Sequence, residues 1–454
     1  MKLSASRRAA LHTLQVARER KAYVRELLNS KAGMVGREGL DERDAAFAER
    51  LALGVTATYG TLDEIIDRFV SRPLDEGVRD ALRVAAFEIL FLDKEPHAAV
   101  SQGVELVKTQ AKSAAGLANA VLRRVSENAA PFMAESPAHR FGLPDWLCDR
   151  IEHDLGADAL DAFGRAGLGQ APAYLASVPG RVRDEDVVDT FDRAGVVVRA
   201  AGAVPGAWQA RDARLAVTSP LVTGEEPCAI VTDYGAQTVA YLAAPAPGMT
   251  MLEVGSGRGT KSILMEGHAR RAGGAADIWA LDLHEGRGVV ASERLRRAGV
   301  TGVRQVTGDA RDLDAVRGLP ASFDAILVDA PCSGTGTLRR HPEITWSLGP
   351  GDVRELARLQ ADILRACAAR LAPGGVLAYA TCSVLCEEDE DVVDEFLDSE
   401  QSQGFEVVRP ADAARDAVVA EELRAHTSPD GYLRTLVREG RCDGHFCALL
   451  RRRA

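Results

Sequence analysis

The sequence predicts an α+α/β protein, in which an all-helical domain is followed by a domain built on a mostly parallel β-sheet. Two observations predict this fold class. Apolar residues recur at helical spacing from residue 1 to about 130, with hardly a run typical of a strand. After about residue 170, short apolar runs alternate with helical segments, which is typical of a parallel sheet covered by helices on both faces.

The first domain is predicted from amphipathic periodicity. One face of a predicted helix carries apolar residues at i, i+3, i+4, i+7 and i+8, namely Leu82, Ala85, Ala86, Ile89 and Leu90. Pro96 follows this helix and is expected to close it off. The stretch 131–150 is rich in proline and small residues, so we expect a domain boundary or linker there rather than the interior of an element.

The second domain is predicted from five apolar runs, which are residues 249–254, 278–282, 303–306, 323–328 and 376–380. Helical segments such as 284–298 and 352–371 separate them. Two further runs, 405–408 and 446–450, are candidates for a terminal antiparallel pair. Ligands of parallel sheets bind outside the carboxyl ends of the strands, so functional residues are expected directly after these runs.

Composition limits the class of protein. The 454 residues carry a formal net charge of −11, but residues 1–150 hold 22 Lys and Arg against 21 Asp and Glu, so any RNA contact must use local basic patches. No apolar run approaches the roughly twenty residues of a membrane span, and the N-terminus lacks a signal-peptide core, so we expect a cytoplasmic protein. The eight cysteines lack CxxC or zinc-finger spacing, so we expect reduced thiols without metal or disulfides.

A glycine-rich loop, "GSGRGTK" at 255–261, follows the first strand of the predicted sheet and opens a helix. Its glycines allow a ligand to approach the free N–H groups of that helix. Asp282 and Asp309 end the next two strands, where they can meet a ribose and an adenine ring. Each Asp alone is better explained as a helix N-cap. Together with the loop they favour S-adenosylmethionine over a nicotinamide, because the later loops offer cysteines and no dehydrogenation apparatus.

Two cysteines stand out because each follows a buried strand, Cys332 in "DAPCSG" and Cys382 in "YATCS". Free cysteines are usually buried small hydrophobes. That interpretation is adopted for five others, Cys148, Cys228, Cys367, Cys442 and Cys447. Cys386 lies one helical turn beyond Cys382 and has no assigned role.

The surrounding motifs carry a resemblance to a known family. "DAPCSGTG" (329–336), with "RRHPEITW" after it, and "PGGVLAYATCS" (373–383), with "EEDE" after it, closely resemble motifs IV and VI of the RNA cytosine-5 methyltransferases. "LDERDAAFAERLALGVT", "LRVAAFEILFL", "PHAAVSQGVELVK" and "LANAVLRRV" in the first 125 residues resemble a NusB-type domain. The order of the two parts resembles the RsmB (Fmu, Sun) family of 16S ribosomal RNA (cytosine-5) methyltransferases over nearly the whole chain.

The resemblance implies three regions. Residues 1–130 would form a NusB-like helical RNA-binding domain, and residues 131–235 a linker and small intermediate domain. Residues 236–454 would form the S-adenosylmethionine-dependent catalytic domain, a Rossmann-like class I methyltransferase with a mostly parallel seven-stranded sheet. The implied partner is small-subunit ribosomal RNA or an assembly intermediate. We expect a monomer that binds neither a membrane nor a metal.

The resemblance also implies roles for single residues. The cofactor contacts it implies are Gly255, Ser256, Gly257, Arg258, Gly259, Thr260, Lys261, Asp282, Asp309 and Asp329. Cys382 would add to C6 of cytosine, Cys332 would help to resolve the adduct, and Asp329 would hydrogen-bond N3 or N4 of the ring. Arg339 and Arg340 follow the first of these loops and are expected to contact RNA phosphates.

The chain departs from the family at two places, and two other functions stay open. "GSGRGTK" stands for the usual Cys-Ala-Ala-Pro-Gly-Gly-Lys, and "TDYGAQ" (232–237) for Gln-Asp-Glu-x-Ser-Gln, although Lys261 and Asp233 are retained. One alternative is a non-enzymatic NusB-type RNA-binding or antitermination scaffold with a degenerate methyltransferase domain. The other is a DNA cytosine-5 methyltransferase, in which the cysteine of Pro-Cys would attack.

Overall fold

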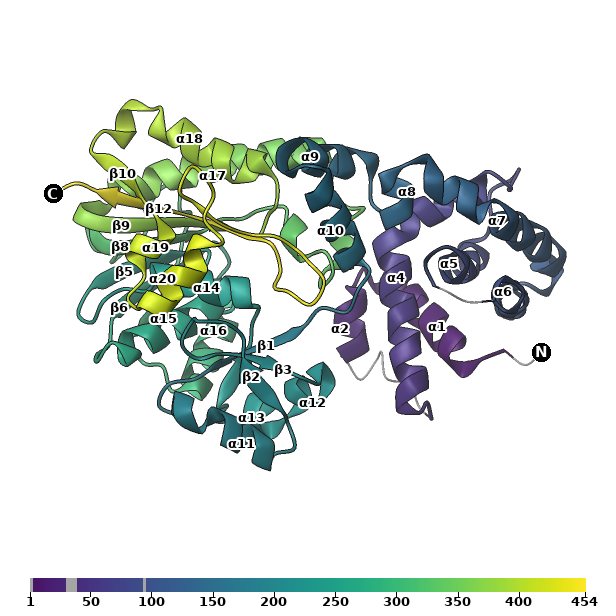
Figure 1. Cartoon of the computed structure of the whole chain (residues 1–454), viewed down its shortest axis with the longest axis horizontal. Coiled ribbons are helices and arrows are strands. Elements are labelled where there is room, and N and C mark those ends of the chain that lie inside the picture. Colours follow the sequence, from purple (N-terminus) through teal and green to yellow (C-terminus); the bar gives the residue numbers. More distant parts are fainter. Residues whose placement is uncertain (1–2, 30–38, 93–94) are drawn as a thin grey trace. The chain divides into compact units, whose positions relative to one another are not determined.

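The computed structural model describes residues 3–29, 39–92 and 95–454 of the chain. The chain forms two compact units, which Figure 1 colours along the sequence. The helical unit comprises Met1–Gln170 and Leu338–Gly349, and the sheet unit comprises Ala171–Thr337 and Pro350–Ala454. A helical unit followed by a sheet unit confirms the predicted fold class.

The helical unit is built from α-helices and two 3-10 turns among the described residues. In chain order they are α1 (Ala5–Arg20), α2 (Val24–Asn29), α4 (Glu42–Asp67), α5 (Glu76–Phe91), α6 (Pro96–Gln110), the 3-10 turn η2 (Lys112–Ala114), α7 (Ala115–Glu135), α8 (Pro137–Phe141), α9 (Asp145–Leu155), α10 (Ala157–Gly167) and the 3-10 turn η5 (Pro342–Ile344). Side chains of Ser4, Asp41 and Asp75 cap α1, α4 and α5 by accepting hydrogen bonds from backbone N–H groups of the first turn.

The predicted amphipathic helix is α5. Leu82, Ala85 and Ala86 on its apolar face are buried in the core of the helical unit. Pro96 does not end this helix, which stops at Phe91, but occupies the first position of α6. Proline suits that position because its missing N–H would have had no partner within the helix.

The linker expected at 131–150 is wrong. Helix α7 continues through Pro131 to Glu135, and α8 and α9 follow, so the predicted boundary at residue 130 falls inside a helix. Pro131 removes one hydrogen bond of the helix. The next residue offsets this loss, because the Phe132 ring is buried and stacks on His139 with 4.0 Å between ring centroids. Burial of an aromatic ring thus overrides a local signal for a linker.

The main sheet of the second unit has the order β10-β12-β9-β8-β5-β6-β7, with β11 paired to β12. The strands are β5 (Thr250–Val254), β6 (Asp277–Asp282), β7 (Val303–Thr307), β8 (Phe323–Asp329), β9 (Leu371–Thr381), β10 (Phe405–Val408), β11 (Leu433–Thr435) and β12 (His445–Arg452). Strands β9, β8, β5, β6 and β7 are parallel, and β12 and β10 form the predicted antiparallel end. The eighth strand, β11, was not predicted, because three residues are too few to show a period.

Helices cover both faces of this sheet (Figure 1). They are α14 (Tyr234–Ala243), α15 (Thr260–Arg271), α16 (Glu285–Ala298), α17 (Pro350–Ala369), α18 (Glu390–Leu397), α19 (Pro410–Ala413) and α20 (Ala417–Arg424), with 3-10 turns η4 (Thr335–Thr337), η6 (Cys386–Glu388) and η7 (Glu400–Ser402). Met251 packs into one apolar cluster with α14 and α15, and its neighbour Leu252 packs into another with α17 and α18. This burial on both faces explains the continuously apolar strands.

A second, antiparallel sheet has the order β2-β3-β1-β4. Its elements are β1 (Ala173–Ser177), η3 (Asp184–Asp186), α11 (Val187–Arg193), β2 (Val198–Ala200), β3 (Ala207–Ala210), α12 (Ala213–Thr218), α13 (Pro220–Thr223) and β4 (Ala229–Val231). Leu175 and Phe191 are fully buried in its core. No strand is predicted here from the sequence, because the strands are short and rich in alanine.

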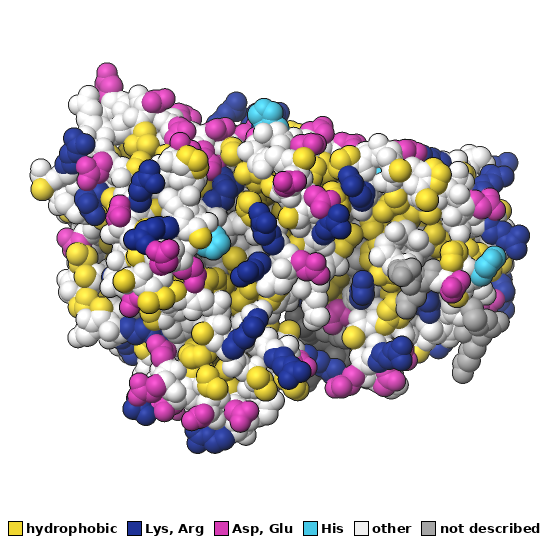
Figure 2. Space-filling view, in the orientation of Figure 1, with side chains coloured by type: hydrophobic (Ala, Val, Ile, Leu, Met, Phe, Trp, Pro, Cys, Tyr) yellow, Lys and Arg dark blue, Asp and Glu magenta, His cyan; other side chains and the backbone are white. Residues whose placement is uncertain are grey.

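Surface features agree with the charge pattern of the sequence. Over the face in Figure 2, Lys and Arg side chains are interspersed with Asp and Glu side chains.

Within residues 3–29, 39–92 and 95–454, no helix combines the length and the apolar character needed to cross a membrane.

Gly54 of α4 gives a test of the packing in the helical unit. A Cβ atom at this position would lie 2.0 Å from Cζ of Phe87, whereas a Cβ atom on Gly116 of α7 would meet no described atom within 4 Å. We expect Gly54→Ala to lower the free energy of unfolding by about 1–3 kcal/mol through overpacking. Gly116→Ala should leave it unchanged or raise it by up to about 1 kcal/mol. Urea titration followed by circular dichroism measures both, and equal stability of the two variants would contradict this packing.

Candidate active site

The glycine loop joins β5 to α15 and is held in a conformation that its glycines permit. Gly255, Gly257 and Gly259 have φ angles of 76°, 54° and 73°. A Cβ atom on Gly255 would lie 2.2 Å from the carbonyl oxygen of Asp329. Only glycine fits there, so the loop lies directly beside the end of β8.

Asp282 fastens the glycine loop to the end of β6. Its Oδ2 accepts a hydrogen bond from the backbone N–H of Gly257 at 2.9 Å, and its Oδ1 accepts one from the backbone N–H of His284 at 2.8 Å. The carboxylate is buried, and each of its oxygens has a second lone pair. Ser256 in the same loop is buried, and its hydroxyl finds no hydrogen-bond partner among the described residues. These unused polar positions fit a ligand with hydroxyl and amino groups, as S-adenosylmethionine has.

Asp309 lies two residues after β7, near the same edge of the sheet. Its carboxylate accepts hydrogen bonds from the backbone N–H and the guanidinium of Arg311. The hydrogen bond from the Arg311 side chain is the main cause that lowers the pKa of Asp309. The group is therefore ionised at neutral pH. Its contact with an adenine ring stays a prediction.

The two cysteines predicted to react lie together. Strands β8 and β9 are parallel neighbours with Asp329 opposite Ala380, so the loops after them share one edge of the sheet. The Sγ atoms of Cys332 and Cys382 are 3.4 Å apart, and both side chains are half-buried. The backbone N–H of Gly336 donates to the carbonyl of Cys382 at 2.9 Å, which ties the two loops together.

An ion pair lies beside the cysteines. Nζ of Lys261, in the first turn of α15, donates to Oδ2 of Asp329 at 2.6 Å. Burial acts to lower the pKa of Lys261, but the charge and hydrogen bond of Asp329 outweigh it and raise this pKa, with a further contribution from Cys382. Lys261 is therefore a cation, and it lies close enough to Cys382 to interact with it electrostatically.

The surroundings of Cys332 act on the acidity of its thiol. The hydrogen bond with Cys382, followed by burial, raises the pKa of Cys332 well above its usual range. Cys332 is therefore disfavoured as a thiolate. The assignment of Cys382 as the nucleophile stays a prediction.

The structure adds residues that the sequence analysis did not identify. Glu253 on β5 is buried beside Lys261 and Asp329, and burial raises its pKa to about 8. Its Oε2 accepts from the Ser262 hydroxyl, whereas its Oε1 has no partner among the described residues. In the sequence, Glu253 could have been noticed because it is a charged residue within the apolar run 249–254. The buried Glu388, which contacts both cysteine loops, comes from the quoted "EEDE" and was given no role of its own.

A further such residue is His445, at the start of β12. It is buried, its Nδ1 lies 3.9 Å from Oδ1 of Asp233, and burial lowers its pKa. A Cβ atom at Gly235 would lie 2.4 Å from this Nδ1. The absence of a side chain at Gly235 thus makes room for the histidine ring.

The structure also locates the two arginines predicted to contact RNA and the remaining cysteines. Arg339 and Arg340 belong to the Leu338–Gly349 segment of the helical unit. The Arg25 guanidinium donates to the backbone carbonyls of both, and the Arg339 side chain is buried. Their contact with RNA stays a prediction. Cys228 and Cys442, expected to be buried, are only partly so, whereas Cys148, Cys367 and Cys447 are buried as expected.

Comparison with known proteins identifies relatives of both units. Residues 240–451 match the model of the family described as 16S rRNA methyltransferase RsmB/F, and residues 4–127 match the NusB family. The Ribosomal RNA small subunit methyltransferase B of Salmonella newport is 33% identical over 367 residues, which cover 78% of this chain and 82% of that protein. Rv1407 of Mycobacterium tuberculosis is 33% identical over 405 residues, or 84% of each chain.

Solved structures share the fold. The crystal structure of PH0851 superposes with a TM-score of 0.75 at 22% identity, covering 99% of this chain and all of that one. NSun6 from Pyrococcus horikoshii, solved with SFG, superposes with a TM-score of 0.57 at 16% identity, covering 68% of this chain and 98% of that one.

Glu253 gives a test of the electrostatics beneath the site. Its pKa of about 8 in the folded state exceeds the ordinary 4.5, so between these pH values the folded state binds more protons than the unfolded state. The free energy of unfolding should therefore fall, by up to a few kcal/mol, as pH rises from about 5 to 8. Glu253→Gln removes this contribution, so its stability relative to wild type should rise over the same range. Urea titrations at several pH values measure the difference, and a constant difference would contradict the raised pKa.

Proposed function

The chain belongs to the 16S rRNA methyltransferase RsmB/F family, and on that premise we propose that it methylates C5 of a cytosine in small-subunit ribosomal RNA. The reaction would use S-adenosylmethionine and proceed through a covalent adduct between Cys382 and C6 of the base. The observation that carries the proposal is the 3.4 Å separation of the Cys332 and Cys382 sulfurs beside the Lys261–Asp329 ion pair. Two sulfurs so placed suit a reaction in which one attacks and the other assists release.

The first step is nucleophilic addition. C5 of cytosine is a poor nucleophile, so the enzyme must raise its electron density. The Cys382 thiolate, favoured by the Lys261 charge, forms a bond to C6, and the electrons of the C5–C6 double bond move onto C5 and the ring. Asp329 would hydrogen-bond N3 or N4 of the ring, which stabilises charge as it develops. For C6 to be reached, the base must be unstacked.

The second step is resolution of the adduct. Bound S-adenosylmethionine supplies the electrophilic methyl group that C5 takes up. The proton left on C5 must then depart, its electrons must restore the C5–C6 double bond, and the bond from C6 to sulfur must break to return the Cys382 thiolate. Cys332, whose sulfur lies 3.4 Å from that of Cys382, is the proposed base for this step. Cys332 can then release its proton to solvent and accept the proton from C5.

The cofactor would lie against the glycine loop. The conformation that Gly255, Gly257 and Gly259 permit shapes the loop, and Ser256 and Asp282 offer polar atoms to a ligand there. Arg258, Thr260, Lys261, Asp309 and Asp329 complete the proposed cofactor contacts. The NusB-like residues 1–130, together with Arg339 and Arg340, would contact the ribosomal RNA. A catalytic thiolate needs a reducing compartment, which fits a cytoplasmic enzyme.

A labelling experiment tests the reaction, and the two cysteines give its controls. The protein is incubated with methyl-labelled S-adenosylmethionine and unmodified 16S ribosomal RNA, and the nucleosides are identified after digestion. We expect label in 5-methylcytidine. Cys382→Ala should form neither product nor a protein–RNA adduct, whereas Cys332→Ala should accumulate an adduct that survives a denaturing gel.

Three results of this experiment decide against parts of the proposal. Label only in another nucleoside would refute cytosine-5 chemistry. No label on free RNA or on a small-subunit particle would favour a non-enzymatic RNA-binding scaffold. An adduct in the Cys382 variant with none in the Cys332 variant would reverse the roles, as in the DNA enzymes.

Asp282 tests cofactor binding separately. Asp282→Ala removes a charge-assisted partner of the ribose, worth about 1.5–3 kcal/mol, so the affinity for S-adenosylmethionine should fall about tenfold to a hundredfold. Asp277→Ala is the matched control, because Asp277 begins the same strand and forms an exposed ion pair with Arg304. Calorimetry measures both affinities. Equal affinities would remove Asp282 from the cofactor site.

A further inference from the structure

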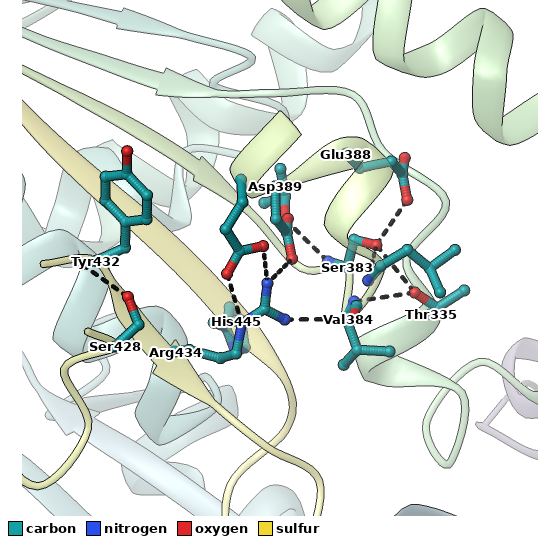
Figure 3. Close-up of polar contacts among 12 residues, drawn as sticks. Thr335, Ser383, Val384, Glu388, Asp389, Ser428, Tyr432, Arg434 and His445 are labelled. Carbon is teal, nitrogen blue, oxygen red and sulfur yellow. Dashed lines mark hydrogen bonds and ion pairs between the residues drawn. The ribbon is translucent and has the colours of Figure 1, made fainter. Parts of the chain in front are cut away.

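The carboxylate of Glu388 binds both cysteine loops at equivalent positions. Ser333 directly follows Cys332, and Ser383 directly follows Cys382. The backbone N–H of Ser333 donates to Glu388 Oε1 at 2.7 Å, and its hydroxyl donates to Oε2. The hydroxyl of Ser383 donates to the same Oε2 at 2.6 Å (Figure 3). A single buried side chain therefore links the residues next to the two sulfurs.

Glu388 is itself held firmly. It ends the turn η6 and is fully buried. The hydroxyl of Tyr379 donates to its backbone carbonyl at 2.6 Å. From α17, the amide of Gln360 donates to Oε1 at 3.0 Å and to the carbonyl of Pro331, next to Cys332, at 2.8 Å. The carboxylate cannot shift without moving both loops.

Hydroxyl groups extend the connection between the loops. Thr335 and Ser383 hydroxyl oxygens are 3.1 Å apart, and Thr335 Oγ1 accepts from the backbone N–H of Val384 at 3.1 Å (Figure 3). The loop after β8 and the loop after β9 are thus joined on both sides of Glu388. Hydrogen bonds within such a buried network have fixed geometry, because any broken bond leaves a polar group without water.

A buried carboxylate is costly in a core, even when donors satisfy it. Small polar residues alone could have connected the two loops. We propose that Glu388 is a positioning residue, which fixes the separation of the Cys332 and Cys382 sulfurs and directs reactivity to Cys382. Its effect on turnover rests on the proposed function, whereas its effect on thiol reactivity does not.

The charge of the Glu388 side chain also supports its role in directing reactivity to Cys382. Glu388 is one of the causes that raise the pKa of Cys332, after the hydrogen bond with Cys382 and burial. A negative charge beside Cys332 disfavours a second thiolate there. The carboxylate therefore helps to keep the two cysteines chemically different, and a neutral side chain of the same shape would reduce that difference.

The test compares Glu388→Gln with Glu395→Gln. Glu395 lies on α18 nearby, is largely exposed and pairs with Arg365, so the same substitution there is the matched control. Each protein, without RNA, is treated briefly with iodoacetamide, and peptide mass spectrometry measures the alkylation rates of Cys332 and Cys382. Fragmentation separates Cys382 from Cys386 on the same peptide. Wild type and control should alkylate Cys382 faster, and Glu388→Gln should lower the Cys382 to Cys332 ratio about tenfold.

Turnover gives a second readout. Displacing reacting groups by a fraction of an ångström slows chemistry without weakening substrate binding, so Glu388→Gln should lower kcat by about tenfold to a hundredfold with KM for RNA within about twofold. An unchanged alkylation ratio together with an unchanged kcat would overturn the inference. If wild type methylates no ribosomal RNA, the proposed function fails, and the alkylation ratio alone decides the role of Glu388.

A second variant covers the case in which Glu388→Gln does not fold. Ser383→Ala removes one hydroxyl donor and leaves the Glu388 charge and the Ser333 contacts in place. We expect kcat to fall about fivefold to tenfold at constant KM, because the loop of Cys382 loses its direct contact with Glu388. Wild-type kcat and a wild-type alkylation ratio in this variant would overturn the inference equally.

Discussion

The parallel pairing of β8 with β9 is the constraint on which the candidate site depends. Because neighbouring parallel strands end at the same edge, the loops after Asp329 and Thr381 must emerge side by side. Strand β5 pairs on the other side of β8, so the glycine loop and Lys261 arrive at the same edge. An insertion of β12 between β8 and β9 would separate the sulfurs, whereas its place beyond β9 leaves them in contact distance.

Charge compensation makes this crowded edge tolerable. Buried ionised groups are costly unless each has a partner. Lys261 pairs with Asp329, and Arg434 pairs with Glu390 and lies 3.1 Å from Asp389 Oδ2, although without hydrogen-bond geometry (Figure 3). Glu388 is satisfied by donors instead of a cation. The carboxylate beside the cysteines is thus held by neutral donors, whereas the Lys261 cation is engaged by Asp329.

The strands and helices that depend on local sequence patterns were predicted correctly. The apolar runs that become β5 to β9 and the helical face of Leu82, Ala85 and Ala86 were predictable, because burial and periodicity leave a direct trace in sequence. The helices through Pro131 were not, because the burial of Phe132 that stabilises them depends on His139 in the next helix. The short strands β1 to β4 and β11 were missed for a similar reason, since their pairing partners and not their composition make them strands.

At the site, the residues that follow each strand, including Asp282, Asp329, Cys332 and Cys382, were predictable from the sequence, and so was a glycine loop after β5. Only the tertiary structure decided that the two sulfurs are 3.4 Å apart, that Lys261 reaches Asp329, and that Glu388 contacts both loops. It also set the raised pKa values of Glu253 and Cys332. The physical reason is that distances and pKa values depend on neighbours from remote parts of the chain, and strand order, which no local segment encodes, selects those neighbours.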